Sequence, residues 1–450
     1  MPLSLGYVAF GLRPQSTPPR DRTRLVNPTQ TKSQPLYVKL TNRVNLFQER
    51  TVAWEKIWHG MDVIGILFVN LQTMAGLYVH IPFCQSKCIY CDFYSMPHRL
   101  HQASEYVDAL LIEAEARREE VKGEPITTVY VGGGTPSLLS EMLMEKLVTG
   151  LGRIFDMSRV EEFTIEVNPD DVHVDYIRFL RSIGVNRVSM GVQSFRDEDL
   201  RLINRRHHAA QAISAVEAIS AAGIENISID LIYGIPGQSQ EDWKKNVEKA
   251  ISLKVNHISA YSLMYEHGTR LSTMRDKGLV EEVAEESVAA MYDILVKALH
   301  NAGYQHYEIS NFCLPGYHSR HNSSYWNLTP YLGLGVAAHS YDGAVRRYNP
   351  SHLQDYLQAM KSHQPFAKAE QCTEPERYDE YVMLRLRTAS GLGIEALQEM
   401  FSPKYSDYFI RKAKVLLAQG LLCEAEGNVF IPEHHVMVTD MITCALMWED

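Results

Sequence analysis

Cysteine is scarce in this chain, with only seven in 450 residues. A small scaffold held together by disulfides needs a far higher density, so that class of secreted protein is excluded. The seven are unevenly spread, because Cys84, Cys88 and Cys91 lie within one short stretch. Clustered thiols in a chain of this length are typical of a metal site in a reducing compartment, and we expect a cytoplasmic location.

Long apolar runs and a surplus of basic residues are also missing. The longest apolar run near the N-terminus, Val63 to Val69, is far too short to cross a bilayer core of about 30 Å, so no integral membrane segment is expected. The formal net charge of -10 lacks the electrostatic footprint of a nucleic-acid-binding protein, and nucleic acid is not an expected partner. With 45% apolar residues, the chain can still bury a sizeable core.

The first 73 residues differ from the rest in composition and periodicity. They contain proline- and arginine-bearing stretches such as RPQSTPPRDRTR and show no motif with a chemical role. This pattern predicts disorder or a non-native extension over residues 1–73, and the hypothesis that follows is a natural start at Met74. N-terminal sequencing of the native protein tests that hypothesis.

From residue 74 to about 310, short β-branched and aromatic runs alternate with amphipathic stretches of helix length. The predicted strands are YVHI, TTVYVGG, FTIEV, NRVSMGV, NISIDLIYG, HISAYSL and YQHYEIS. Such alternation predicts βαβ units, a parallel sheet and the α/β fold class. Spacing alone leaves open whether the sheet is doubly wound or forms a full or partial barrel.

After a connecting segment, 311–369, the pattern changes in the region 370–450. The stretches Leu384 to Phe401 and Phe409 to Gln419 are typical of helices, and Gly420 suits a helix C-terminus. LLCEAEGNVFI then predicts a hairpin. Helices followed by one short hairpin resemble a winged-helix module.

The strongest motif is YVHIPFCQSKCIYCDFYS, in which the three clustered cysteines have C-x-x-x-C-x-x-C spacing. Iron-sulfur clusters are held by thiolates, and three ligands in one loop leave one iron of a 4Fe-4S cube open to an exchangeable partner. A structural zinc site is the alternative, but zinc requires four ligands. The other four cysteines stand singly, at Cys313, Cys372, Cys423 and Cys444.

The triplet, with the aromatic Tyr90 before its third cysteine, resembles the hallmark of the radical S-adenosylmethionine (SAM) superfamily. Further matches run through the chain to one branch of that superfamily, which contains oxygen-independent coproporphyrinogen dehydrogenase and the HemW-type haem chaperones. They comprise YVHIPFC, the GGGTPS run, IEVNP, SMGVQSF, NRRHH and IDLIYGIPGQ. The resemblance implies a partial (β/α) radical SAM barrel over 74–310, with a HemW-like C-terminal domain over 370–450.

The same resemblance implies a set of SAM contacts. These are Tyr78, Gly133, Gly134, Thr135, Glu166, Gln193, Arg205 and Asp230. A glycine run after a strand lets backbone approach a ligand closely and offer N–H groups to it. A carboxylate at the end of a strand, such as Glu166, can accept from the SAM amino group or ribose. Taken one at a time, each residue is equally well explained as a turn, cap or solvated polar group.

One position separates the two branches. Coproporphyrinogen dehydrogenase carries an additional cysteine two residues after the third, where this chain has Phe93. The motifs H-N-x-x-Y-W, from His321 to Trp326, and Y-x-G-x-G-x-x-A-H-S, from Tyr331 to Ser340, match HemW-type proteins instead. The resemblance therefore implies a chaperone that binds haem and hands it to an acceptor protein. The alternative is an enzyme that acts on a porphyrinogen after an electron donor reduces the cluster and SAM is cleaved.

His321 is the first candidate for the haem ligand, because imidazole is a common axial ligand and Tyr325 and Trp326 could supply flat apolar surface. The competing interpretation is that His321 braces a loop while both aromatic residues pack into the core. His339 is the next candidate, and Cys313 offers a thiolate.

Overall fold

The computed structural model describes residues 75–449, so the predicted disorder or extension over 1–73 and the start at Met74 lie outside the described residues. Twelve strands form one large sheet in these residues. In chain order they are β1 (Ala75–Ile81), β4 (Ile126–Gly133), β5 (Glu162–Val167), β6 (Arg187–Gln193), β7 (Asn226–Tyr233), β8 (His257–Ser262), β9 (Gln305–Glu308), β10 (Asn311–Cys313), β11 (Tyr331–Leu334), β12 (His339–Tyr341), β13 (Arg346–Tyr348) and β14 (Lys368–Glu370).

Helices connect these strands. They are α3 (Ala103–Arg117), α4 (Glu141–Ile154), α5 (Val174–Ser182), α6 (Asp197–Leu202), α7 (Ala209–Ala221), α8 (Gln240–Ser252), α9 (Arg270–Asp276), α10 (Glu285–Asn301), α11 (Arg320–Trp326) and α12 (Leu353–Lys361). Their boundaries follow ordinary capping: Ser239, for instance, forms a capping box with Asp242 at the start of α8. Two very short strands, β2 (Phe83–Cys84) and β3 (Met96–Pro97), pair beside the sheet.

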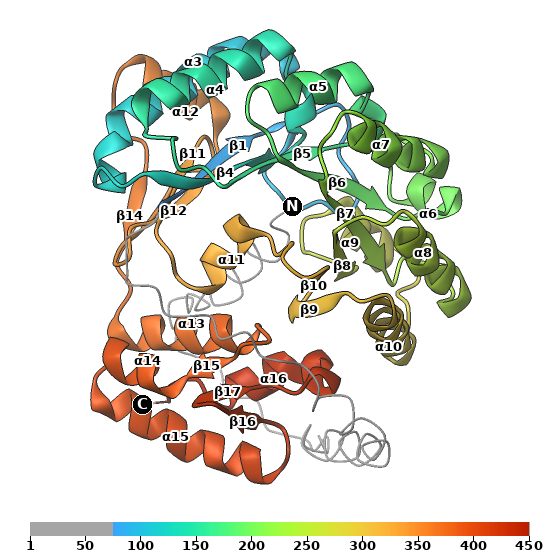
Figure 1. Ribbon diagram of the computed structural model, residues 1–450, viewed down its shortest axis with the longest axis vertical. Helices are drawn as coiled ribbons and strands as arrows, with labels where there is room; N and C mark the ends of the chain where they lie inside the picture. The colour runs from blue at the N-terminus through green and yellow to red at the C-terminus, as the bar shows by residue number, and fades with distance from the viewer. Residues whose placement is uncertain (1–74, 450) are drawn as a thin grey trace, which may run out of the picture. The chain divides into compact units, whose positions relative to one another are not determined.

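The strands β1, β4, β5, β6, β7 and β8 lie side by side in chain order and all run parallel. The sheet curves, and its larger helices cover the outer side (Figure 1). It stays open, with β14 at one edge and β9 at the other. This arrangement confirms the prediction of a partial (β/α) barrel.

Side chains alternate cleanly between the two faces of the parallel strands. The outward residues are apolar and form the main core with the helices; they include Leu77, Val79, Val129, Val131, Phe163, Ile165, Val188, Met190, Ile227, Ile229 and Ile258. The inward residues at the matching register positions are polar, aromatic or glycine; they include Tyr78, His80, Tyr130, Gly132, Thr164, Glu166, Arg187, Ser189, Ser228, Asp230, His257 and Ser259. The barrel lumen is therefore polar, which is unlike the packed apolar interior of a full (β/α) barrel.

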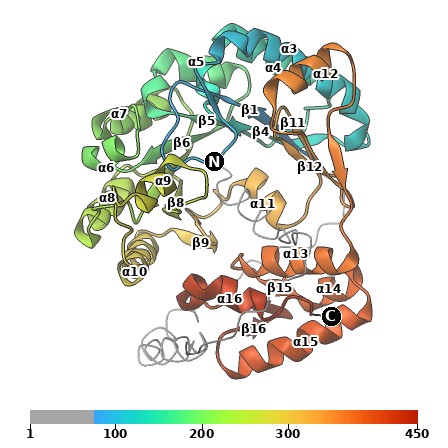
Figure 2. The same cartoon turned by 180° about the vertical axis from the view of Figure 1, so that it is seen from behind.

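The expected connecting segment, 311–369, carries five short strands of the sheet together with α11 and α12. β10 pairs antiparallel with β8, and β11 pairs parallel with β1 on the other side of the barrel. The strands β12, β13 and β14 then continue the sheet beyond β11 with antiparallel pairings. The segment thus extends both edges of the barrel, as the view from behind also shows (Figure 2).

The C-terminal region has its own small core. Its elements are α13 (Glu374–Leu386), β15 (Leu392–Gly393), α14 (Ile394–Met400), α15 (Pro403–Ala418), β16 (Cys423–Ala425), β17 (Asn428–Phe430) and α16 (Thr439–Cys444). The strands form a three-stranded sheet in the order β15-β17-β16. This sequence of elements confirms the winged-helix-like prediction. The single helix expected from Leu384 to Phe401 is wrong, because β15 divides it into the end of α13 and α14.

Two histidines of the barrel share one carboxylate of the C-terminal region. His300 Nε2 and His306 Nδ1 each lie 2.9 Å from Glu433 Oε1. Both hydrogen bonds hold the pKa of Glu433 down, against the effect of its burial, to about 2. The hydrogen bond to Glu433 raises the pKa of His300. This junction is therefore a charge-assisted contact whose strength depends on pH.

Candidate functional site

The three clustered cysteines lie at and after the end of β2. All three thiols are free and partly exposed. Cys84 Sγ accepts a hydrogen bond from Thr135 Oγ1 at 3.5 Å, and Cys88 Sγ accepts one from Arg205 Nη1 at 3.6 Å. Within residues 75–449, no three His, Cys, Asp or Glu side chains converge as the ligands of a single metal ion do. A 4Fe-4S cube has no such requirement, since each thiolate binds a different iron.

Burial favours the protonated form of two of these thiols, those of Cys84 and Cys91. Burial raises the pKa of Cys84, and burial together with the neighbouring Cys88 raises the pKa of Cys91 to about 12. Burial opposes the charge of Arg205, but the adjacent Cys88 and Tyr90 hold its pKa above the ordinary value. A permanent cation therefore faces the thiol loop, where it favours thiolate ligands once they form.

The glycine run at the end of β4 has a different role from the one expected. Gly133 N donates to Glu166 Oε2 at 2.9 Å, and Gly134 N donates to the Ile81 carbonyl at 2.7 Å. Thr135 N donates to the Phe83 carbonyl at 2.8 Å. The amides of Gly134 and Thr135 hold the end of β4 against β1 and β2, and the amide of Gly133 holds it against β5. These amides are therefore already bonded within the chain and are not free to donate to a ligand in this structure. Glycine is needed here because a Cβ would meet His80 or the backbone of residues 81–83. The close approach of the chain places Thr135 beside the thiol loop.

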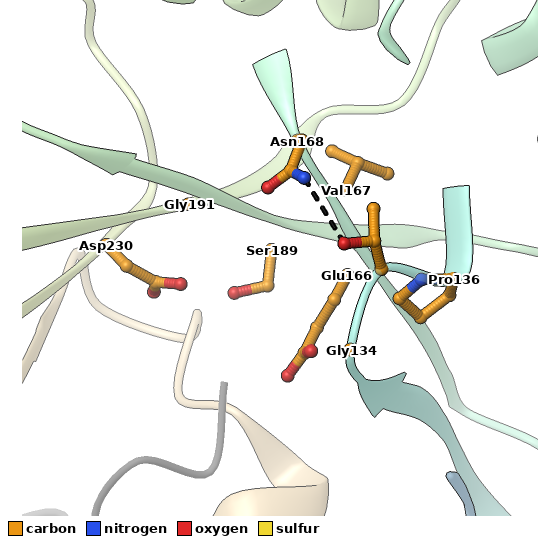
Figure 3. Close-up of a pocket in the computed structure, with 9 residues that line it drawn as sticks. Gly134, Pro136, Glu166, Val167, Asn168, Ser189, Gly191 and Asp230 are labelled. Atoms are coloured by element: carbon orange, nitrogen blue, oxygen red, sulfur yellow. Dashed lines mark hydrogen bonds between the residues drawn. The ribbon is translucent and has the colours of Figure 1, made fainter. Parts of the chain in front are cut away.

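A pocket opens at the carboxyl ends of the parallel strands, where α/β folds bind their ligands (Figure 3). Its lining consists of Gly134, Thr135, Pro136, Glu166, Val167, Asn168, Ser189, Gly191 and Asp230. Glu166 and Asp230 enter it from different strands, with Ser189 between them. Four predicted SAM contacts, Gly134, Thr135, Glu166 and Asp230, are thus brought together at one pocket.

The two carboxylates of this pocket differ in their surroundings. Glu166 Oε1 accepts from the Tyr130 hydroxyl at 2.9 Å, while its other oxygen accepts from the Gly133 amide. These bonds fix the carboxylate in the pocket wall. Burial raises the pKa of Asp230. A ligand carrying hydroxyl or ammonium donors would stabilise the charge of both groups.

Gln193 and Arg205 lie beside the pocket. Gln193 is fully buried with φ +67°, and in the described part of the chain neither its amide oxygen nor its amide nitrogen has a hydrogen-bond partner. Arg205 Nη2 donates to Asn168 Oδ1 at 2.8 Å and to the Gly191 carbonyl. A Cβ on Gly191 would lie 2.8 Å from Gln193 Nε2. A strained, buried amide without a partner is typical of a residue held ready for a polar ligand.

Tyr78, another predicted SAM contact, does not line the pocket. Its hydroxyl lies 2.9 Å from His80 Nδ1, and His80 Nε2 lies 2.9 Å from the Tyr94 carbonyl. Burial lowers the pKa of His80, so the ring is neutral at pH 7. Tyr78 therefore orients His80, which packs against Gly133.

His321 is buried at the opposite end of the barrel, beside the first residues of β4. Its Nδ1 lies 2.9 Å from Thr128 Oγ1, and its Nε2 lies 2.9 Å from the Tyr325 hydroxyl. The ring stacks on Tyr130 with centroids 5.2 Å apart. Burial lowers its pKa to about 3. Both nitrogens are thus engaged within the chain, which matches the bracing interpretation.

The other residues considered for haem binding differ in exposure. Trp326 is buried against Met383 and Leu384, so it is a core residue and offers no free face. The Cys313 thiol is fully buried, and this burial raises its pKa to about 12. His339 is partly exposed on β12, where its ring stacks on Tyr348 at 5.8 Å.

Comparison with known proteins identifies the family. Residues 78–250 match the Radical SAM superfamily, and residues 372–437 match the HemN C-terminal domain. The "Heme chaperone HemW" of Lactococcus lactis is 36% identical over 78% of this chain and 92% of its own length. That of Bacillus subtilis is 33% identical over 84% of this chain and 100% of its own length. The chain belongs to the HemW family of radical SAM proteins.

The solved structure of coproporphyrinogen III oxidase (HemN) from Escherichia coli has the same fold. Its TM-score is 0.73, with 24% identity over 83% of this chain and 90% of that chain. The pocket of this chain also contains residues that sequence reasoning did not select, namely Pro136, Val167, Asn168, Ser189 and Gly191. Asn168 stands within the quoted IEVNP motif, directly after a predicted strand, and that position was the available signal.

Proposed function

We propose that this chain is a haem chaperone that binds haem and transfers it to an acceptor protein. The observation that carries the proposal is the combination of HemW membership with Phe93 at the position of the dehydrogenase's additional cysteine. The proposed setting is the cytoplasm. Among residues 75–449, every helix falls short of the length or apolarity that a membrane span requires.

The proposed resident cofactors are a 4Fe-4S cluster and SAM. Cys84, Cys88 and Cys91 are free thiols in one loop and would hold three irons. The pocket lined by Glu166 and Asp230 would hold SAM, with the orphaned amide of Gln193 at its edge. When reduced, such a cluster can supply the electron that cleaves SAM.

The chain's own residues have positioning roles in this proposal. Arg205 joins the Cys88 thiol to the pocket wall through Asn168. Glu166 would accept a hydrogen bond from a SAM donor, while the Tyr130 hydroxyl holds its carboxylate in place. Thr135 bridges the two sites, because its hydroxyl contacts Cys84 Sγ and its residue lines the pocket. An electron donor is required only if SAM is cleaved.

The alternative is a radical SAM enzyme acting on a porphyrinogen, which the HemN-like fold permits. One anaerobically reconstituted preparation distinguishes the two. Haem titration followed by transfer to an apo-acceptor tests the chaperone, and 5′-deoxyadenosine release with coproporphyrinogen loss tests the enzyme. We expect stoichiometric haem binding and no protoporphyrinogen. Porphyrinogen turnover without haem binding would refute the chaperone proposal.

His321 is the proposed haem ligand, and ligation through Nε2 would displace its hydrogen bond to the Tyr325 hydroxyl. We predict that His321→Ala shifts the Soret band and weakens haem binding, with iron content and SAM binding unchanged. His352→Ala, on the exposed start of α12, is the matched control. An unchanged haem spectrum and affinity in His321→Ala would exclude His321 as the haem ligand. His339 and Cys313 would then be tested as ligands.

A further inference from the structure

One charged side chain deep in the barrel has no role in the proposed cluster or SAM sites. Arg187 is the first residue of β6, and Ser189, two residues on, lines the SAM pocket. Because side chains alternate along a strand, Arg187 points into the same lumen one level below Ser189. The intervening Val188 belongs to the apolar core on the other face. Arg187 is only 1% exposed.

We define the lumen floor as six inward polar side chains around Arg187, namely Thr128, Thr164, Arg187, Ser228, His257 and His321. Thr164 pairs with Arg187, Thr128 lies one register level lower, and Ser228 and His257 lie one level higher, opposite Ser189. Thr128 pairs with His321 at 2.9 Å. Ser228 Oγ lies 2.7 Å from His257 Nδ1, whose other nitrogen lies 2.8 Å from the Tyr307 hydroxyl. The polar atoms of these floor residues therefore have hydrogen-bond partners, either in the floor or in Tyr307.

Arg187 is the exception. A guanidinium has five N–H donors and stays charged in proteins, yet the described contacts of Arg187 comprise one 3.5 Å hydrogen bond from Nη1 to Thr164 Oγ1. Its Nε is buried and, within the described range, has no partner. Within residues 75–449, no ion pair joins Arg187 to a carboxylate. A buried, undercompensated cation is costly and is rarely kept without an anion to bind.

The neighbouring acids do not fill this need. Glu162, on the adjacent strand, accepts from the backbone amides of His321 at 3.0 Å and Arg320 at 2.8 Å, so its carboxylate holds the start of α11. Asp230 stands two register levels higher, where it is paired with Gly191 rather than with Arg187. The Arg187 guanidinium therefore keeps N–H donors that could bind a carboxylate from outside the described residues.

We propose that Arg187 is the receptor for a propionate carboxylate of haem bound in the barrel lumen. This inference rests on the proposed function. Haem carries two carboxylates, and a guanidinium fork matches a carboxylate in bidentate geometry. His321, the proposed ligand, belongs to the same floor, so this end of the barrel would supply both the iron ligand and the carboxylate receptor. The proposed SAM contacts lie toward the other end of the strands. The haem propionate and the SAM carboxylate would therefore be bound at separate places.

The test compares haem with haem dimethyl ester, whose carboxylates cannot ionise, in spectrophotometric titrations of the reconstituted full chain. We expect esterification to weaken binding to wild type on the order of 10- to 100-fold, as loss of a charge-assisted hydrogen-bonded pair does. Arg187→Gln should bind both compounds equally, at the weaker level, while Arg187→Lys retains part of the discrimination. Arg178→Gln, an exposed arginine on α5, is the matched control and should behave as wild type. SAM affinity and iron content should not change in any variant.

A second measurement distinguishes haem binding by Arg187 from a merely structural role of this residue. Removing an uncompensated buried charge should raise the thermal midpoint of the apoprotein in Arg187→Met, whereas loss of a structural arginine would lower it. Wild type that binds haem and its ester equally, or Arg187→Gln that retains the discrimination, overturns the inference and leaves the proposed function standing. Loss of SAM binding in Arg187→Gln with haem binding intact also overturns it and assigns Arg187 to the SAM carboxylate. Wild type that binds no haem at all refutes the proposed function itself.

Discussion

Gly133 is the position where a single added carbon should do most damage to the cofactor end of the barrel. Its φ is +111°, a region that side-chain-bearing residues rarely adopt. A Cβ there would lie 2.5 Å from both Cε1 and Nδ1 of His80. The ring cannot easily retreat, because Tyr78 and the Tyr94 carbonyl hold its two nitrogens at 2.9 Å. Gly133→Ala therefore combines backbone strain with a clash against a fixed ring.

The expected cost follows from those two effects. Strained backbone contributes about 1–3 kcal/mol, and overpacking contributes about 1–3 kcal/mol more. Gly237→Ala is the matched control, since its φ is +80° and nothing lies within 4 Å of an added Cβ. Anaerobic urea unfolding followed by circular dichroism should show a midpoint lower in Gly133→Ala than in Gly237→Ala. Adding His80→Ala should restore part of the difference. Equal midpoints for the two glycine variants would refute the reasoning.

Three further predictions concern other parts of the chain. Cys88→Ala should lose the four-iron cluster on anaerobic reconstitution while Cys423→Ala, an exposed single cysteine, keeps full iron and sulfide content. Phe93→Cys should not produce protoporphyrinogen from coproporphyrinogen, since one thiol does not rebuild a substrate pocket. Glu433→Gln should destabilise the chain by up to about 1 kcal/mol at pH 5.5 and by less at pH 8.5, measured by urea midpoints. The sign follows from the raised pKa of His300: its stabilisation is complete below the ordinary value and is lost as pH rises through the folded value.

The parallel strands could be predicted because each carries its own local signal. In NRVSMGV and NISIDLIYG the apolar residues alternate with polar ones, and the structure has β6 and β7 over these stretches. The cysteine spacing is equally local. Strands of three or four residues such as β11 and β12 have no comparable signal, because they exist only through pairing with β1 and with each other. That is why 311–369 was expected to be a connection.

The site shows the same division between local and long-range information. Motifs indicated which residues gather at the pocket, including Glu166 and Asp230. They could not show that the amides of Gly133 and Gly134 are already bonded within the chain, because their partners lie on other strands. The helix expected from Leu384 to Phe401 failed for a related reason: β15 forms by pairing with β17, far along the chain.

Strand β6 links the two ends of the barrel. It carries Arg187 on the floor, Ser189 and Gly191 in the pocket wall and Gln193 at the rim, all on its inward face. The register irregularity between Gly191 and Gln193 turns the last of these inward with a positive φ. A slip of one residue would place the apolar residues of β6 in the lumen and all of the polar ones in the core, so its register is strongly fixed by burial. The same hydrophobic alternation that folds the barrel therefore also sets the spacing between Arg187, the proposed haem carboxylate receptor, and Gln193, a proposed SAM contact.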